Sequence, residues 1–274
     1  MRLAPGPDGT LFAAIPRSGG WVLALLDRGG RPRPGWPILV ENAGPCELLL
    51  PLEDGGIRLV CLTSRPGADT SDEWAYAFDA GGRSLTGWPV PLPPGQWTAG
   101  RMALDELVLF GVELSPPAQW LTTVAADGAI RSGKKVPGDD AWGHSGGDVG
   151  PDRVAVGVED GGLIEGSAEV SRITALALSG ARAGWPVTID GVASGPVFAS
   201  AGRVVLTVGS RVQGTSRIVV VDPRTRALSR SPRLAIRTAE SGVDCVASLP
   251  ERPLVARDGK IVVFSAVDTA IFAL

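Results

Sequence analysis

Three copies of one short motif decide the fold: Gly35-Trp36-Pro37, Gly87-Trp88-Pro89 and Gly184-Trp185-Pro186. Each copy follows an apolar run and a turn that contains glycine. Two weaker copies place Lys134 and Ser231 at the tryptophan position, so that the unit recurs about every 50 residues. A period of this length without helical periodicity is typical of a propeller blade that has about four strands.

The runs between the motifs have the composition of strands. Trp21–Asp27, Trp74–Asp79 and Ile218–Asp222 are short and mostly apolar, and each ends at an aspartate. The chain's 37 Gly and 23 Pro fall between such runs, where they fit tight turns. We therefore predict an all-β fold, a single β-propeller of about six four-stranded blades. The expected domain spans residues 1–274, with units at approximately 1–40, 41–92, 93–138, 139–189, 190–236 and 237–274.

The last expected blade is incomplete. Its strands are predicted at Pro253–Ala256, Lys260–Ser265 and Thr269–Leu274, and the sequence ends before an outer strand. An unpaired strand edge invites association with other chains. We expect either that residues near Met1 fill the gap, or that the chain is a piece of a longer ring and associates through the incomplete terminal blade.

Charge and hydropathy exclude several classes of partner. The net charge is −3 with mixed signs, which argues against a nucleic-acid partner. No apolar run reaches the ~18 residues of a membrane span. The stretch Met1–Leu11 lacks the basic start and the apolar segment of a signal peptide. The sequence does not predict a compartment.

The three cysteines are Cys46, Cys61 and Cys245, an odd number that argues against a disulfide framework. If the turn at Glu53–Gly56 centres its hairpin, Cys61 faces Leu48 and Cys46 is a diagonal neighbour. A diagonal pair is poorly placed for a disulfide, so we expect buried free thiols. Because the sequence has no CxxC motif and no Cys/His cluster, we predict neither a metal site nor a cofactor.

Two recurring residues have a structural interpretation. The motif tryptophan is predicted to wedge between neighbouring blades while its glycine allows a tight turn, the alternative being a ring of aromatic ligand platforms. The aspartate that ends each third strand is predicted to accept hydrogen bonds from amides of the following turn. These aspartates are Asp27, Asp79, Asp127 and Asp222.

Unequal connections indicate where a binding site would lie. In a four-stranded meander the second-to-third loops and the blade-to-blade connectors emerge on one face, and here both are long and polar. Loops on a rigid scaffold commonly carry binding residues. Trp97 and Trp142 occupy matching places before two inner strands, and are interpreted as inner packing or as contacts to a ligand or peptide. The candidate binding residues are Trp97, Arg101, Asp139, Asp140, Trp142, His144 and Asp148.

We interpret two polar stretches on these loops without assigning them a catalytic role. His144 is the only histidine and lies near Ser145 and Asp148 in a glycine-rich loop. Three neighbours on one loop rarely have the geometry of a catalytic triad, so we interpret the stretch as loop structure or as a ligand contact. The acidic segment Asp69–Glu73 is interpreted as solvated.

The chain resembles a known class of propellers. The Gly-Trp-Pro-Val endings, together with Ala193–Ala199 and the Gly-Arg-Val-Val-Leu run that follows, resemble bacterial propellers of the pyrroloquinoline-quinone-like repeat type and of the FG-GAP type. The resemblance covers nearly the whole chain. It implies eight blades, a vicinal cysteine pair and calcium for the quinone-dependent dehydrogenases of that superfamily, whereas this chain has about six units and no adjacent cysteines. Non-enzymatic members are implied to be assembly scaffolds, sensor domains or protein-binding platforms.

We therefore expect a non-catalytic scaffold or sensor domain that binds an unidentified protein or small molecule on the long-loop face. One alternative is a six-bladed propeller hydrolase or lactonase-like enzyme with a metal in its channel. Another is a structural fragment of a larger surface protein. In the enzyme alternative the metal would be held by inward carboxylates, for which the sequence offers Glu41, Asp139, Asp148, Asp190 and Glu240.

Overall fold

The structure is a computed structural model that describes residues 1–63, 72–138, 143–160, 169–193, 195–199, 202–210, 215–231, 254–255, 260–264 and 269–273. This part of the chain is almost entirely β-strand and contains no α-helix. One short 3-10 turn, η1 at Pro7–Gly9, is the exception to the strands and turns. Within the same residues no helix is long and apolar enough to cross a membrane. The predicted all-β class is confirmed.

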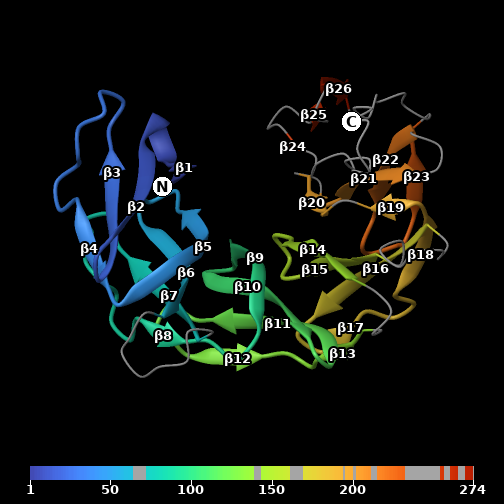
Figure 1. The fold of residues 1–274 in the computed structure, drawn as a ribbon, viewed down its shortest axis with the longest axis horizontal. Helices are drawn as coiled ribbons and strands as arrows, with labels where there is room; N and C mark the ends of the chain where they lie inside the picture. The colour runs from blue at the N-terminus through green and yellow to red at the C-terminus, as the bar shows by residue number, and fades with distance from the viewer. Residues whose placement is uncertain are drawn as a thin grey trace, which may run out of the picture. The chain divides into compact units, whose positions relative to one another are not determined.

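The strands form antiparallel sheets, each built from strands that are consecutive in the chain (Figure 1). The first sheet has the order β1 (Arg2–Pro5), β2 (Leu11–Arg17), β3 (Gly20–Leu26) and β4 (Ile38–Glu41). The second has the order β5 (Ala43–Pro51), β6 (Ile57–Thr63), β7 (Glu73–Phe78) and β8 (Val90–Pro91). The third has β9 (Gln96–Ala103), β10 (Glu106–Leu114), β11 (Pro117–Val124) and β12 (Ile130–Ser132), and β13 (Val136–Pro137) also pairs with β11.

Three further sheets follow. The fourth has β14 (Gly143–Val149), β15 (Ala155–Asp160), β16 (Val170–Ala177) and β17 (Gly180–Ala181), with β18 (Val187–Asp190) also paired to β16. In the fifth, β19 (Val192–Ala193) and β20 (Val197–Phe198) both pair with β21 (Val204–Ser210), which is followed by β22 (Thr215–Val221) and β23 (Leu228–Arg230). The sixth is described as β24 (Leu254–Val255), β25 (Lys260–Phe264) and β26 (Thr269–Ala273).

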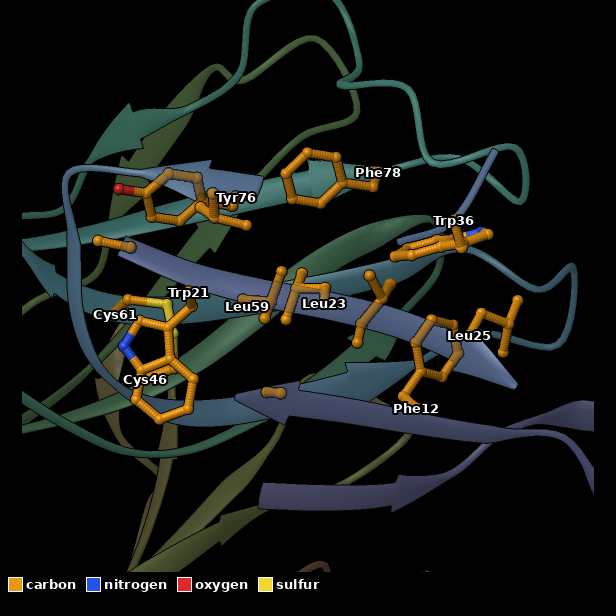
Figure 2. Close-up of a cluster of buried hydrophobic side chains, with 14 residues drawn as sticks. Phe12, Trp21, Leu23, Leu25, Trp36, Cys46, Leu59, Cys61, Tyr76 and Phe78 are labelled. Atoms are coloured by element: carbon orange, nitrogen blue, oxygen red, sulfur yellow. A yellow bond between two sulfur atoms is a disulfide. The ribbon is translucent and has the colours of Figure 1, made fainter. Parts of the chain in front are cut away.

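The chain divides into two compact units, residues 1–109 with 122–132, and residues 110–121 with 133–274. Each contains an apolar core between consecutive sheets. In the first unit Phe12 and Leu23 of the first sheet pack with Leu59 and Tyr76 of the second (Figure 2). The corresponding core of the second unit joins the fourth and fifth sheets. Because these sheets are covered by neighbours, central strands such as β6 are apolar nearly throughout.

The motif tryptophans pack between consecutive sheets, as predicted. Trp36 is 6% exposed, contacts the ring of Phe12 at a centroid distance of 5.5 Å, and donates its indole N–H to the carbonyl of Ala80 at 3.0 Å. Trp88 is similarly buried and donates to the carbonyl of Ala126 at 2.9 Å. In both cases the acceptor lies in a turn of the next sheet. The aromatic side chain thus joins two repeats through apolar burial and one hydrogen bond.

The aspartates that end the third strands organise the turns, which confirms the sequence interpretation. Asp79 Oδ1 accepts hydrogen bonds from the amides of Gly81 and Arg83, both at 2.9 Å. Asp27 does the same for Gly29 and Arg31, at 2.8 and 2.9 Å. Asp127 and Asp222 each accept from the amide two residues further on. The repeated sequence therefore specifies the repeated turn through local chemistry.

Sheet order alone does not establish a closed propeller. The observed sheets are antiparallel meanders of four or five strands with a sixth, three-stranded sheet among the described residues. That these sheets are blades around a common axis stays a prediction, and so do the single domain and its six unit boundaries.

Candidate functional site

One end of the second sheet brings a buried carboxyl group, a second carboxylate and a disulfide together. At this end β5 begins, β6 ends and β7 begins, because Ala43 pairs with Thr63 and Leu62 pairs with Glu73 in the antiparallel ladders. The connection between β6 and β7, residues 64–71, lies outside the described residues. The site is therefore placed at the end of the sheet that carries this long loop.

Glu73 is the buried carboxyl group. It is the first residue of β7, its side chain is enclosed and the residue is only 5% exposed. Its backbone carbonyl accepts a hydrogen bond from the amide of Leu92 at 2.9 Å, which fixes the start of the strand. Within the described residues, Oε2 of Glu73 has no hydrogen-bond partner. A buried carboxylate in this position would be poorly compensated, which favours the neutral acid.

The environment raises the pKa of Glu73 from 4.5 to about 8. Burial is the largest cause, because it removes water from the charged form. The negative charge of Glu47 adds to the increase, and a hydrogen bond from the backbone amide of Trp97 opposes it. At neutral pH Glu73 is therefore mainly a protonated acid.

Glu47 supplies the second carboxylate. It lies on β5 and is exposed, and it occupies a register shift between Cys46 and Leu48 in the pairing with β6. Arg2 of β1 donates a hydrogen bond to the backbone carbonyl of Glu47. The extra residue of a bulge changes the local direction of a strand and its side chains. The bulge thus places the exposed Glu47 where its charge acts on the buried Glu73.

Cys46 and Cys61 form a disulfide, and the expectation of free thiols for this pair is wrong (Figure 2). The expected regular hairpin would place Cys61 opposite Leu48. In the structure Leu48 pairs with Val60, and the register shift then brings Cys46 directly opposite Cys61, with their Cα atoms 3.8 Å apart. The difference has two parts: the hairpin register near the turn already differs by one residue from the expected one, and the bulge at Glu47 shifts it by one more.

The interpretation of Asp69–Glu73 as a solvated acidic stretch is wrong for its last residue. Glu73, Ala75 and Ala77 alternate along β7, and both alanines are fully buried. Side chains two residues apart in a strand share a face. The alternating pattern of β7 therefore indicated that Glu73 is buried on the same face as these alanines. Its neighbour Asp72 is exposed.

A hollow of about 650 Å³ lies at the other end of β5 and β9. It is bordered by the turn residues Glu53 and Asp54 and by Arg101, Leu104 and Asp105. This is the end with the short hairpin turns. The surface hollow and the Glu73 site are thus at opposite ends of the same strand, β5.

The structure separates Trp97 from Arg101. Both are on β9, four residues apart on the same face, a separation of about 13 Å along a strand. Trp97 is completely buried and Arg101 is exposed at the hollow. The burial of Trp97 favours the first of its two interpretations, inner packing, and its backbone contributes to the Glu73 site.

The other candidate residues lie in the second unit or outside the description. Asp148 accepts a hydrogen bond from the amide of Phe198 at 2.8 Å, a contact that ties β14 to β20. The backbone of His144 pairs with that of Glu159, so that His144 and Asp148 belong to strand β14 and the interpretation of this stretch as a loop is wrong. Asp139, Asp140 and Trp142 lie outside the described residues. A binding role for these residues stays a prediction.

A second buried carboxylate, Glu159, was not anticipated from the sequence. It is 3% exposed at the end of β15, receives a hydrogen bond from Nε2 of Gln119 at 3.2 Å, and has Arg172 Nε at 3.6 Å. Gly138 and Gly157 leave the space that these side chains occupy, because a Cβ at either position would lie within 3 Å of them. The charge is paired, which is how proteins commonly accommodate a buried carboxylate.

The described residues do not present a metal-binding set. No group of three or more His, Cys, Asp or Glu side chains in them is arranged to hold an ion. Of the carboxylates expected to converge on a channel metal, Glu41, Asp148 and Asp190 are described and belong to no such group. Asp139 and Glu240 fall outside the described residues.

The chain is similar in fold to solved all-β enzymes. A cobalt-substituted apocarotenoid oxygenase of Synechocystis aligns with a TM-score of 0.54 and 11% identity over 90% of this chain and 62% of the oxygenase. A chimera of that oxygenase with RPE65 gives the same values. A Bacteroides caccae protein of unknown function aligns at a TM-score of 0.47 and 12% identity, over 95% of this chain and 81% of that one.

No family model matches the chain, and no curated protein matches it. The pyrroloquinoline-quinone-like family is accordingly not shown, and the all-β sheet fold is what the structural likeness establishes. The chain spans 62% of the length of the oxygenase. The oxygenase structure contains cobalt, whereas the described residues of this chain hold no group of three or more His, Cys, Asp or Glu side chains arranged to bind a metal ion.

The expectation of a non-catalytic protein- or ligand-binding or sensor domain is corrected by these comparisons. Solved structures that share this fold at a TM-score above 0.5 include an oxygenase and its variants, which are enzymes. The sequence repeats gave no indication of this, because they consist of packing and turn residues, which are the same whether or not a propeller carries a catalytic group.

Proposed function

We propose that the chain is a catalytic β-propeller domain whose acid–base centre is the carboxyl pair Glu73 and Glu47. The propeller is supported by the repeat of about 50 residues and by the succession of antiparallel meanders. The single observation that carries the catalytic proposal is a buried carboxyl group whose pKa is raised by burial and by the charge of a second, exposed carboxylate. Two carboxyl groups in different environments are a common source of an acid and a base at one pH.

The reaction that fits this pair is hydrolysis of a small substrate. Glu47 as a carboxylate accepts a proton from a water molecule, and the oxygen of that water attacks the electrophilic carbon of the substrate. Glu73 donates its proton to the leaving group as the scissile bond breaks. A hydrogen bond from the backbone amide of Trp97 holds the Glu73 carboxyl group in place.

Charge defines the substrate class. The negative charge of the exposed Glu47 acts on the buried acid and gives the approach to Glu73 a negative potential. An anionic substrate would be repelled, so that we propose a neutral or cationic one. Because the chain spans only 62% of the oxygenase at 11% identity, we carry no reaction over from that enzyme.

The test is a panel of neutral p-nitrophenyl esters, p-nitrophenyl glycosides and lactones with the unaltered chain and three variants. Glu73→Gln keeps the shape of the acid but removes its proton, and Glu47→Gln removes the base. Each is expected to lower kcat by about 10²- to 10⁴-fold on a substrate that the unaltered chain hydrolyses. Glu53→Gln, at the exposed turn beside the hollow, is the matched control and is expected to retain full activity.

The pH profile provides a second readout. Because the donor must be protonated, kcat/KM is expected to fall as pH rises through about 8, the pKa of Glu73. Retention of kcat in Glu73→Gln, or hydrolysis of none of the substrates by the unaltered chain, would contradict the proposed function.

A further inference from the structure

The Cys46–Cys61 bridge lies at the point where β5 leaves the regular ladder. Leu48 pairs with Val60, but the next observed pair is Cys46 with Cys61, so that Glu47 is the extra residue between two paired positions. Both cysteines are buried, at 1% and 0% exposure, while Glu47 is exposed. The covalent link and the extra residue therefore define the same bulge.

In a register without this bulge, the Glu47 side chain would project from the other face of the sheet. A regular ladder beyond Leu48 would pair Glu47 with Cys61 and move Cys46 opposite Leu62. Directly opposed residues in an antiparallel pair project on the same face, and a slip by one residue exchanges the two faces. Glu47 would then share the buried face of Cys61, and Cys46 would leave it. A bond between the two sulfur atoms is compatible only with the bulged register.

The bridge and the buried acid adjoin consecutive positions of β6 on opposite faces of the sheet. Cys61 is opposite Trp74, and Leu62 is opposite Glu73, in the ladder between β6 and β7. The bond thus connects the strand that bears Glu47 to the strand that is paired with the start of β7. In the described part of the chain, Glu47 of β5 acts on Glu73 through its charge, and Arg2 of β1 donates a hydrogen bond to the Glu47 backbone. Asp72 precedes Glu73 in the sequence.

We propose that the Cys46–Cys61 disulfide is a positioning element that holds the Glu47 carboxylate beside Glu73, and that its reduction separates the pair. Reduction by a dithiol such as dithiothreitol breaks the S–S bond, takes up two electrons and two protons, and leaves two thiols and oxidised dithiothreitol. Without the bond, the bulge is free to regularise and Glu47 is free to leave. The consequence for activity rests on the proposed function, whereas the position of Glu47 does not.

The test is a double-mutant cycle whose readout is the titration of Glu73 itself. The protein is labelled with ¹³C at glutamate carboxyl groups, and the Glu73 resonance is assigned by its absence in Glu73→Gln. In the oxidised chain, Glu47→Gln is expected to lower the titration midpoint of Glu73 by roughly one pH unit, because it removes a like charge. In a Cys46→Ala/Cys61→Ala background the same substitution is expected to change the midpoint little, since Glu47 is no longer held there.

An equal effect of Glu47→Gln in both backgrounds would overturn the proposal. Cys245→Ala is the control for removal of a cysteine outside this bridge, and is expected to preserve the full effect. If the double alanine variant does not fold, as judged by circular dichroism, the comparison is made on the unaltered chain and Glu47→Gln before and after dithiothreitol. An effect of Glu47→Gln that persists after reduction, with the free thiols confirmed by mass, would equally overturn it.

The titration separates this inference from the proposed function. A midpoint that responds to Glu47 only when the bridge is intact supports the positioning role even if the chain hydrolyses no substrate. Hydrolysis that depends on both carboxyl groups and is unchanged by dithiothreitol, together with an unchanged midpoint, supports the function and overturns the positioning role.

Discussion

At the scale of the residue, Glu73 combines two properties that rarely occur together on a strand: it is 5% exposed, and one of its oxygens lacks a hydrogen-bond partner in the described part of the chain. A carboxylate in that state would leave water without adequate compensation. Protonation removes the charge, which explains why burial dominates the increase of its pKa. The carboxyl group of Glu73 is therefore mainly protonated at neutral pH.

The free energy of unfolding should depend on pH because Glu73 has a raised pKa in the folded chain. The folded pKa of about 8 is above the value of 4.5 for an unperturbed glutamate, so the contribution of Glu73 is fully present below pH 4.5 and is lost as pH rises to about 8. Between these values the free energy of unfolding is expected to decrease by roughly 1 kcal/mol per pH unit from this group. Urea unfolding at several pH values measures the slope. In Glu73→Gln that slope should be absent, and an identical slope in the variant would contradict the assignment.

Gln119 provides a second test at this scale. Its amide donates to the buried carboxylate of Glu159 at 3.2 Å, and Gln119 is itself 1% exposed. Gln119→Ala is expected to lower the free energy of unfolding by about 2 kcal/mol, since it removes a hydrogen bond to a buried charged group. Gln96→Ala, at an exposed position, is the control and should change it by less than about 0.5 kcal/mol. Equal effects in chemical denaturation would show that the Gln119–Glu159 contact is not stabilising.

At the scale of the element, the repeated Gly-Trp-Pro unit joins one sheet to the turn of the next. Trp36 donates to the carbonyl of Ala80, and Gly35 approaches the same turn closely. A Cβ on Gly35 would lie 2.0 Å from the carbonyl oxygen of Gly81, and its φ of +85° is one that glycine adopts easily. The motif thus needs both a small residue and a large one at consecutive positions.

Two substitutions of Trp36 should separate its apolar and polar contributions. Trp36→Ala is expected to destabilise the chain by about 3–5 kcal/mol, because it leaves a cavity beside Phe12. Trp36→Phe keeps an aromatic ring but loses the hydrogen bond to Ala80, so that a smaller loss of about 1–3 kcal/mol is expected. Thermal and urea denaturation give both values. The interpretation of Trp36 as a wedge between sheets would be contradicted if the alanine variant were as stable as the unaltered chain.

The elements also show how far the sequence could be interpreted. Strand character, the turn aspartates and the packing role of the motif tryptophans follow from periodicity and local chemistry, and these predictions are confirmed. The disulfide was missed because the register set at the hairpin turn and a bulge of one residue together decide which side chains face each other, and nothing in the composition of β5 marks either of them. The burial of Glu73 could be predicted from its alternation with the buried Ala75. The acidic residues that precede Glu73 instead favoured a solvated segment.

The candidate site was the harder part to predict. Its groups come from three strands, and their proximity depends on register as well as on composition. Trp97 was selected for its side chain, yet the structure uses its backbone amide at Glu73 and buries its ring. Arg101 borders the hollow at the opposite end of the strands. Loop length directs attention to the end of the sheet where the chain continues into residues 64–71, which is also the end of the proposed Glu73 site, without indicating which side chain matters there.

At the scale of the whole molecule, the proposed propeller makes a prediction about size. A compact chain of 274 residues has an expected radius of gyration of about 19 Å. Sheets arranged around a common axis should give this value in small-angle X-ray scattering from a monomeric sample, with a compact distance distribution. A line of sheets would give a clearly larger radius and a long tail in the distribution, and this result would exclude the propeller.

The central claim is that Glu73 is a protonated acid in the folded chain at neutral pH, and its own carboxyl titration tests this most directly. The ¹³C resonance of the Glu73 carboxyl group, identified by its loss in Glu73→Gln, is followed from pH 3 to pH 10. The account predicts a midpoint near 8, well above those of the exposed glutamates. A midpoint near 4.5 in the folded protein would show that Glu73 is an ordinary carboxylate and would contradict the account.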